Sequence, residues 1–298
     1  MTHYFEKNRE DFVLDPLQQH YFLTAPYDLS DTGGGGYSRA DLHLHGSGSS
    51  DSRTETAVLF ERAVDLGISI VANTDHDTTK KGGEAQAAAE ARGLLYIPGS
   101  AEITTRLAPG QWPHIVVYNV PPDQLDKYVS EHPFRPYRLR KLTHTKELLE
   151  WVKLFPDALA VAAHPRENVY VNSLSFRQVT YFESIGLLDG MEVLSGFPGE
   201  AGLDIKRKAL AQGLGADFIQ MGNSDAHEGS QVGHAQTIFS GHPRTAAEAI
   251  NCLRQNQCRP FRPEWAKQPR QRPQRLSVGI ERVLNRVVTA PEQILHSR

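Results

Sequence analysis

Histidine and carboxylate side chains are concentrated in short stretches spread over most of this sequence. The stretches are DLHLH, followed by an aspartate six residues after its last histidine, and then TDHD, AEIT, a lone histidine, AHPR and SDAH. They supply nine candidate metal ligands: His43, His45, Asp51, His76, Glu102, His114, His164, Asp225 and His227. Imidazole combined with carboxylate suits Zn²⁺, Mn²⁺ and Fe²⁺ better than Ca²⁺ or Mg²⁺. Nine donors exceed what one ion can coordinate, so the pattern predicts a centre of two or three divalent transition-metal ions.

Such a centre implies a particular chemistry. Clustered divalent cations lower the pKa of a shared water molecule, so that a metal-bound hydroxide can act as the nucleophile at neutral pH. The same ions bind phosphoryl oxygens and offset charge on the attacking and leaving groups. No serine, cysteine or threonine nucleophile is needed, and the sequence has no GxSxG motif.

Three further residues are candidates for catalytic roles. Asp75 precedes His76 and could orient its imidazole through the second ring nitrogen. Its neighbour Asp77 either does the same or caps a helix that begins near Thr79. Arg166 could clamp a phosphate with its forked guanidinium, the alternative being a structural salt bridge. His234 could donate a proton to the substrate or its leaving group, or could simply be solvated.

The elements that must position these residues alternate between strand and helix. Strands are expected at 40–45, 68–74, 94–103, 114–120, 158–163, 188–194 and 217–222, and helices at 55–66, 79–92, 144–154, 176–185, 203–212 and 246–256. This alternation predicts an α/β fold with a parallel sheet, and about seven units favour a TIM-like barrel over an open sheet. An open doubly wound sheet is the alternative, but its GxGxxG motif is missing. Most of the candidate ligands follow strands, where the carboxyl ends of parallel strands meet.

Composition and charge restrict the class of protein and suggest how the chain is divided into domains. The 298 residues carry a formal charge of −3, so the protein as a whole is no polycation, and two cysteines cannot build a disulfide framework. We expect an N-terminal extension with a glycine-rich hinge (1–37), a catalytic domain (38–263) and a basic, Pro/Arg-rich C-terminal extension with a short helix (264–298). Without a signal peptide or an apolar stretch of membrane-spanning length, the protein is expected to be cytoplasmic.

These motifs resemble those of the PHP (polymerase and histidinol phosphatase) family, over residues 40 to 261. The resemblance implies a distorted (β/α)7 barrel with a trinuclear metal site. It implies that His43, His45, Glu102 and Asp225 hold one metal, and that Glu102 bridges to a second, which His114 and His164 complete. It implies that Asp51, His76 and His227 hold the third.

Three functions are compatible with this sequence. The first is a metal-dependent phosphoesterase acting on a small phosphorylated substrate. The second is a metal-dependent hydrolase of a carboxyl ester or carbamate, because the same nucleophile attacks carbonyl carbon. The third is a non-catalytic PHP module that binds nucleic acid or a partner, which the complete set of ligand positions disfavours. The sequence does not indicate an oligomeric state.

Overall fold

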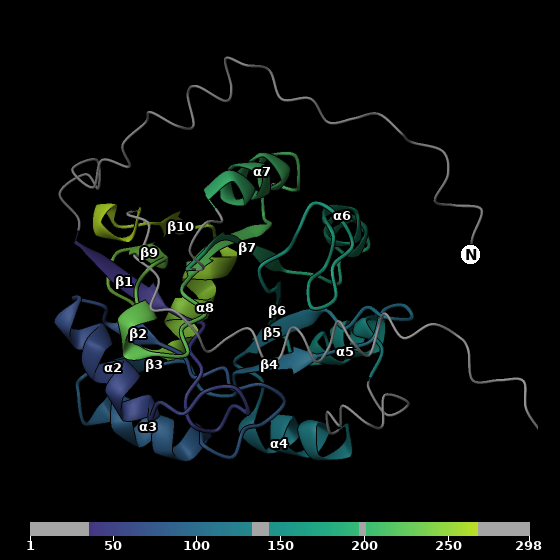
Figure 1. The fold of residues 1–298 in the computed structure, drawn as a ribbon. Coiled ribbons are helices and arrows are strands. Elements are labelled where there is room, and N and C mark those ends of the chain that lie inside the picture. Colours follow the sequence, from purple (N-terminus) through teal and green to yellow (C-terminus); the bar gives the residue numbers. More distant parts are fainter. Residues whose placement is uncertain (1–35, 133–142, 197–200, 268–298) are drawn as a thin grey trace, which may run out of the picture.

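The protein forms a mixed α/β fold built on two five-stranded sheets (Figure 1). The structure is a computed structural model and describes residues 36–132, 143–196 and 201–267. Nearly all of the proposed N-terminal and C-terminal extensions lie outside these residues, so the expected domain boundaries stay predictions. In the described residues, no helix is long and apolar enough to cross a membrane.

The first sheet has the strand order β10-β9-β1-β2-β3. Its members are β1 (Tyr37–Asp41), β2 (Ile70–Val71), β3 (Leu95–Tyr96), β9 (Gln236–Ser240) and β10 (Cys258–Phe261). Strands β1, β2 and β3 are parallel, whereas β9 is antiparallel to both β1 and β10. Strands β9 and β10 were not among the expected elements.

The second sheet has the order β4-β5-β6-β7-β8. Its members are β4 (Ala101–Thr104), β5 (His114–Tyr118), β6 (Leu159–Ala162), β7 (Gly190–Ser195) and β8 (Ile219–Asn223). Strand β5 is antiparallel to β4 and to β6, while β6, β7 and β8 are parallel. The expectation of an all-parallel sheet is therefore wrong, because the short connection between β4 and β5 forms a hairpin, which a parallel pair cannot use.

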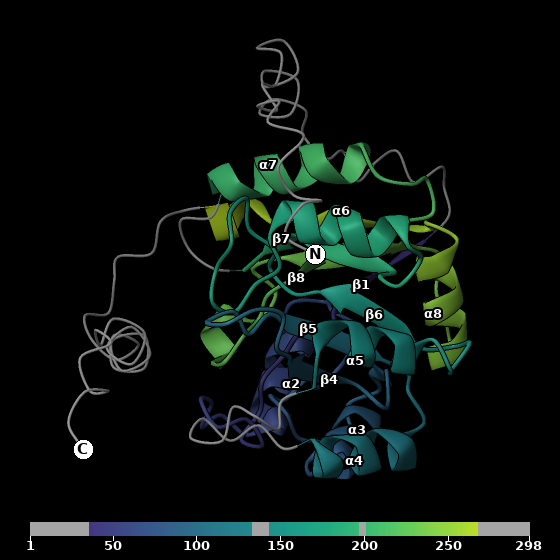
Figure 2. The same cartoon turned by 90° about the vertical axis from the view of Figure 1, so that its right-hand side faces the viewer.

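Seven helices surround the strands (Figure 2), counted over the described part of the chain. They are α2 (Thr56–Asp65), α3 (Gly82–Glu90), α4 (Pro122–Glu131), α5 (Thr145–Val152), α6 (Phe176–Ser184), α7 (Ala201–Gln212) and α8 (Ala246–Arg254). All six expected helices are present, and α4 is additional. Local signals explain two of the starts: Pro122 opens α4 with its fixed φ, and Thr245 accepts a hydrogen bond from the Glu248 amide at the start of α8.

The single strand expected over 94–103 is divided into β3 and β4 by a turn at Pro98-Gly99. Gly99 has a φ of +58°, and a Cβ at this position would lie 1.7 Å from the carbonyl oxygen of Val120. Only glycine fits both conditions. The turn moves Glu102 out of the first sheet and into the second.

Two isolated bridges link the sheets where the candidate ligands lie. Leu44, between His43 and His45, bridges to Ala226, and His76 bridges to Glu102. Continuous ladders do not join the two sheets into a barrel within the described residues. The bridges nevertheless bring together histidine and carboxylate motifs that are far apart in the sequence.

Candidate metal centre

All nine candidate ligands gather in one place, linked through short contacts between imidazole nitrogens and carboxylate oxygens. His43 and His45 follow β1, His76 follows β2, His164 follows β6, and Asp225 and His227 follow β8. Glu102 lies within β4 and His114 begins β5. Asp51 comes from the loop after β1. The expectation that these residues converge is thus met by the geometry.

Glu102 is the centre of this cluster and is completely buried. Its Oε2 lies 3.1 Å from His43 Nε2, 3.2 Å from His45 Nε2 and 3.1 Å from His76 Nδ1. Its Oε1 lies 3.1 Å from His114 Nδ1 and 3.3 Å from His164 Nε2. One carboxylate therefore contacts five imidazoles, the arrangement expected of a bridging ligand.

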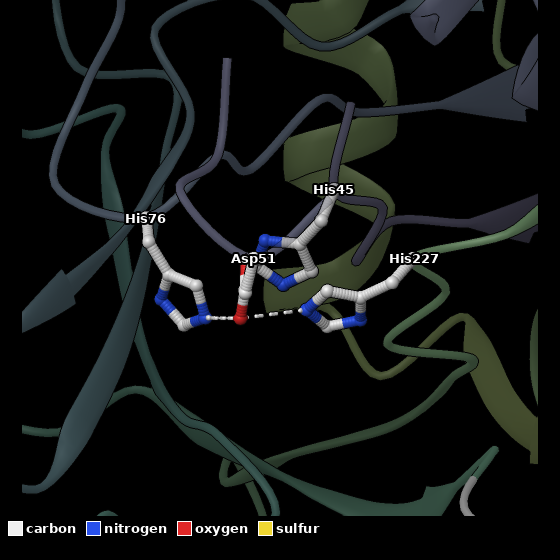
Figure 3. Close-up of side chains that lie close together, drawn as sticks. All are labelled: His45, Asp51, His76 and His227. Atoms are coloured by element: carbon white, nitrogen blue, oxygen red, sulfur yellow. Dashed lines mark hydrogen bonds and ion pairs between the residues drawn. The ribbon is translucent and has the colours of Figure 1, made fainter. Parts of the chain in front are cut away.

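A second carboxylate, Asp51, organises the more exposed side of the cluster (Figure 3). Its Oδ2 lies 3.3 Å from His76 Nε2 and 3.1 Å from His227 Nε2. His45 stacks on His227 with ring centroids 4.3 Å apart, so the buried and exposed sides are continuous.

Three groups of ligand atoms are close enough to hold an ion, each group within 4.8 Å: His43, His45, Glu102 and Asp225; His45, Asp51, His76 and His227; His76, Glu102 and His114. In the first group, His43 Nε2, His45 Nε2, Glu102 Oε2 and Asp225 Oδ1 are buried atoms without a well-formed hydrogen bond among the described residues. Such atoms are costly unless something else satisfies them. A divalent cation does so, and the mixed nitrogen and oxygen donors fit a transition metal.

The carboxylates have a strong electrostatic effect on the buried histidines. Burial alone lowers the pKa of His45, but the close carboxylates of Asp225 and Glu102 raise it to about 9. Burial likewise opposes protonation of His43, but the charges of Glu102, Glu192 and Asp225 hold its pKa well above the usual value. Because an imidazolium cannot bind a metal, cations compete with protons for these positions.

Sequence reasoning missed Glu192, a buried carboxylate behind the cluster on β7. Its Oε1 lies 2.8 Å from His43 Nδ1 and accepts from Asn223 Nδ2 at 3.0 Å, while its Oε2 accepts from the His164 amide at 2.9 Å. The bond to Nδ1 leaves His43 Nε2 facing the cluster. His164 has a φ of +31°, an unfavourable value for a side-chain-bearing residue, and the Glu192 bond helps to hold it. No motif in the sequence marks this residue.

The two aspartates of the TDHD motif accept hydrogen bonds from neighbouring segments of the chain. Asp75 accepts from the Gly46 amide at 2.7 Å and from Asn73 Nδ2 at 2.9 Å, which holds the loop after His45. Both His76 ring nitrogens face Glu102 and Asp51 instead, so Asp75 does not orient that imidazole as expected. Asp77 accepts from the amide and hydroxyl of Thr104, and α3 begins only at Gly82, so the expected helix cap is also wrong.

Arg166 and His234 have defined surroundings. The guanidinium of Arg166 lies 4.4 Å from the Tyr170 ring centroid, a cation–π contact, and its backbone pairs with Leu174 and Phe176. His234 is buried, and its ring meets Trp265 edge-on at 5.1 Å between centroids. The expectation that His234 is merely a solvated loop residue is therefore wrong. Contact of either residue with substrate stays a prediction.

Comparison with known proteins gives one consistent result at the level of the fold. Neither a protein-family model nor a curated protein matches the sequence. Among solved structures, a two-domain Bacteroides vulgatus protein described as containing a predicted PHP-like metal-dependent phosphoesterase aligns with a TM-score of 0.54 at 16% identity. The alignment covers 76% of this chain and 65% of the other. This chain has the PHP-like fold.

Two further structures agree with that assignment. A Bifidobacterium adolescentis protein assigned as a metal-dependent phosphoesterase aligns with a TM-score of 0.51 at 21% identity, covering 63% of this chain and 87% of the other. An amidohydrolase from Chromobacterium violaceum, solved with sulfate and without metal, aligns with a TM-score of 0.53 at 20% identity, covering 77% and 99%. The PHP-like fold and the histidine and carboxylate cluster confirm the resemblance seen in the motifs.

Proposed function

We propose that this protein is a metal-dependent phosphoesterase that hydrolyses a small phosphorylated substrate at a trinuclear centre. The observation that carries the proposal is the set of four buried ligand atoms, from His43, His45, Glu102 and Asp225, that face one another without well-formed hydrogen bonds. The PHP-like fold supports it. We infer further that the two sheets, linked by the bridges at Leu44 and His76, together correspond to the distorted barrel of that fold.

Each ligand group has a proposed role. His43, His45, Glu102 and Asp225 hold one ion, and Glu102 with His114 and His164 holds a second. Asp51, His76 and His227 hold a third. When bound, Mn²⁺, Zn²⁺ or Fe²⁺ ions supply the positive charge that lowers the pKa of water and offsets charge on a phosphoryl group. The protein contributes fixed ligands, because Glu192 and Ser49 bond to the outward-facing Nδ1 atoms of His43 and His45.

Three other residues have proposed roles around this centre. Arg166 follows His164 by two residues and is proposed to clamp the substrate phosphate. His234 is proposed to donate a proton to the leaving group. Asp75 is proposed to act indirectly, because it holds the loop that links His45 to Asp51.

A hydrolase of a carboxyl ester, carbamate or amide is the second candidate. The structural similarity to a protein named an amidohydrolase motivates it, since the same set of metal ligands can serve attack on carbonyl carbon. The two candidates differ in whether the substrate presents a phosphate dianion. A side chain that binds the phosphate dianion should therefore matter for the first candidate and not for the second.

The substitution Arg166→Lys distinguishes the two candidates. Lysine keeps the charge but cannot make the bidentate fork, so kcat/KM for p-nitrophenyl phosphate should fall by about 10- to 100-fold, or ~1.5–3 kcal/mol. Turnover of p-nitrophenyl acetate and metal content should not change. Both should be measured with the Mn²⁺-loaded enzyme. Efficient acetate hydrolysis with negligible phosphate hydrolysis, insensitive to the substitution, would favour the second candidate.

A further inference from the structure

One arginine, Arg106, lies two residues past the end of β4, the strand that carries Glu102. Side chains alternate between the two faces of β4: Ala101 and Ile103 pack in one hydrophobic cluster, whereas Glu102 enters the metal centre. The alternation continues past the strand, since Leu107 packs against the same cluster as Ile103. Arg106 therefore shares the face of Glu102.

Strand register gives the position of this arginine relative to the ligands. Thr104 pairs with His114 across the β4–β5 hairpin, so the two residues form one rung of the ladder. Arg106 lies two residues further along, which corresponds to about 7 Å beyond that rung. Its backbone is held there by bonds from the Arg106 amide to the Thr143 carbonyl and from the Thr145 amide to the Arg106 carbonyl.

The guanidinium of Arg106 is positioned by one histidine and has further N–H groups to donate. Its Nη2 lies 2.8 Å from His144 Nε2, and because guanidinium can only donate, His144 must accept. Its Nε is buried and has no hydrogen-bond partner among the residues that the structure describes. A buried N–H without a partner is costly, so this donor favours an incoming hydrogen-bond acceptor.

The positive charge of Arg106 itself favours an anionic acceptor. Two described acids near this segment already have partners: Asp77 accepts from the amide and hydroxyl of Thr104, and Glu147 Oε2 accepts from the His144 amide at 3.1 Å. Because Glu147 already occupies the start of α5, Arg106 rather than the helix terminus is the group available to a ligand.

We propose that Arg106, positioned by His144, forms a subsite for a second oxyanion of the substrate, beyond the phosphate held at the metal centre. The subsite deepens the proposed phosphoesterase function and rests on it. The preferred substrate then carries two anionic groups, a phosphate ester and, several ångströms away, a phosphate or carboxylate. A guanidinium binds either group with charge-assisted hydrogen bonds.

Three aryl phosphates test the subsite with the Mn²⁺-loaded enzyme: phenyl phosphate, 4-carboxyphenyl phosphate and 1,4-phenylene bisphosphate. The rigid ring keeps the two anions apart. Wild type should prefer at least one of the doubly anionic substrates over phenyl phosphate by about 10- to 100-fold in kcat/KM. Arg106→Gln should abolish most of that preference, because kcat/KM should fall much more for the doubly anionic substrates than for phenyl phosphate. Which substrate is preferred distinguishes carboxylate from phosphate.

Matched variants separate recognition from structure. Arg92→Gln removes the same charge from an arginine that bonds the Ala88 carbonyl, and should keep the preference. His144→Gln, which still offers an acceptor to Arg106, should retain more of the preference than His144→Ala. An equal preference in wild type and Arg106→Gln, or none in wild type, would overturn the subsite.

Binding without turnover distinguishes failure of the subsite from failure of the phosphoesterase function. Calorimetric titration should show tighter binding of 4-carboxyphenylphosphonate or 1,4-phenylenebisphosphonate than of phenylphosphonate, and Arg106→Gln should remove the difference. If no phosphate ester is hydrolysed but this difference is found, the subsite stands and the proposed activity fails. Hydrolysis of phenyl phosphate without an Arg106-dependent difference in binding overturns the subsite alone.

Discussion

Glu102 is the residue on which the metal centre depends most, since its carboxylate contacts five imidazoles. Glu102→Gln should lower metal content at more than one position. Loss of a side chain that hydrogen-bonds to a metal ligand lowers activity by about 10- to 100-fold. Loss of the shared carboxylate itself should lower activity by more than that. His164→Asn removes a ligand from one position only and should cost less. Metal analysis and kcat/KM of both folded variants check this, and equal losses would contradict the bridging role.

The histidines make stability depend on pH in a metal-free sample. The pKa of His45 is raised to about 9 from an ordinary value of 6.5, so its protonation stabilises the folded state. That contribution is complete below pH 6.5 and is lost as pH rises through 9. The Tm of chelator-treated protein should therefore fall between these values, and Mn²⁺ should restore stability at the higher pH. A metal-free Tm that rises over this interval would contradict the assignment.

At the scale of elements, β7 supports the centre without supplying a ligand. Glu192 on β7 joins the residues after β1 and β6 to the end of β8 by bonding His43, the His164 amide and Asn223. Glu192→Gln removes the charge and one acceptor, so metal affinity should fall by about 10- to 100-fold. Calorimetric titration of chelator-treated protein with Mn²⁺ measures this directly.

A matched substitution gives the control for this test. Glu183 on α6 accepts from the Gly215 amide near the surface, so Glu183→Gln loses a similar bond away from the centre. Its Mn²⁺ affinity should equal that of wild type. A loss of Tm in Glu192→Gln without a change in Mn²⁺ affinity would show that Glu192 supports the fold alone.

For the whole molecule, the number of bound ions is the property that the cluster determines most directly. Three groups of ligand atoms are present in the described residues, and they share Glu102, His45 and His76. After loading with Mn²⁺ or Zn²⁺, we expect two or three ions per chain by mass-spectrometric metal analysis. Fewer than about one ion per chain would reject a multinuclear centre. The shared ligands also predict that chelation removes the ions together rather than one at a time.

The sequence alone was sufficient to identify the nine clustered residues: seven occur in short motifs with metal-binding residue types, and Asp51 and the lone His114 match the remaining positions of the family that these motifs resemble. It also predicted six helices, since their apolar spacing and caps are local signals. The hairpin between β4 and β5, the strands β9 and β10 and the division of the 94–103 segment were not predicted. Strand β9 pairs with β1 from the other end of the described chain, and Gly99 turns against the Val120 carbonyl; such contacts between segments are not encoded in local patterns.

The contributions of sequence and tertiary structure differ most clearly at residues that act on the metal centre through another residue. His43 could be recognised from its motif, whereas Glu192 is one carboxylate in a buried strand and becomes significant only because folding brings it to 2.8 Å from His43. Arg106 resembles any charged residue near a turn until strand register places it on the face of Glu102. Sequence determined which donors are available to a metal; the tertiary structure decided which groups orient them, because orientation depends on contacts between segments that are far apart along the chain.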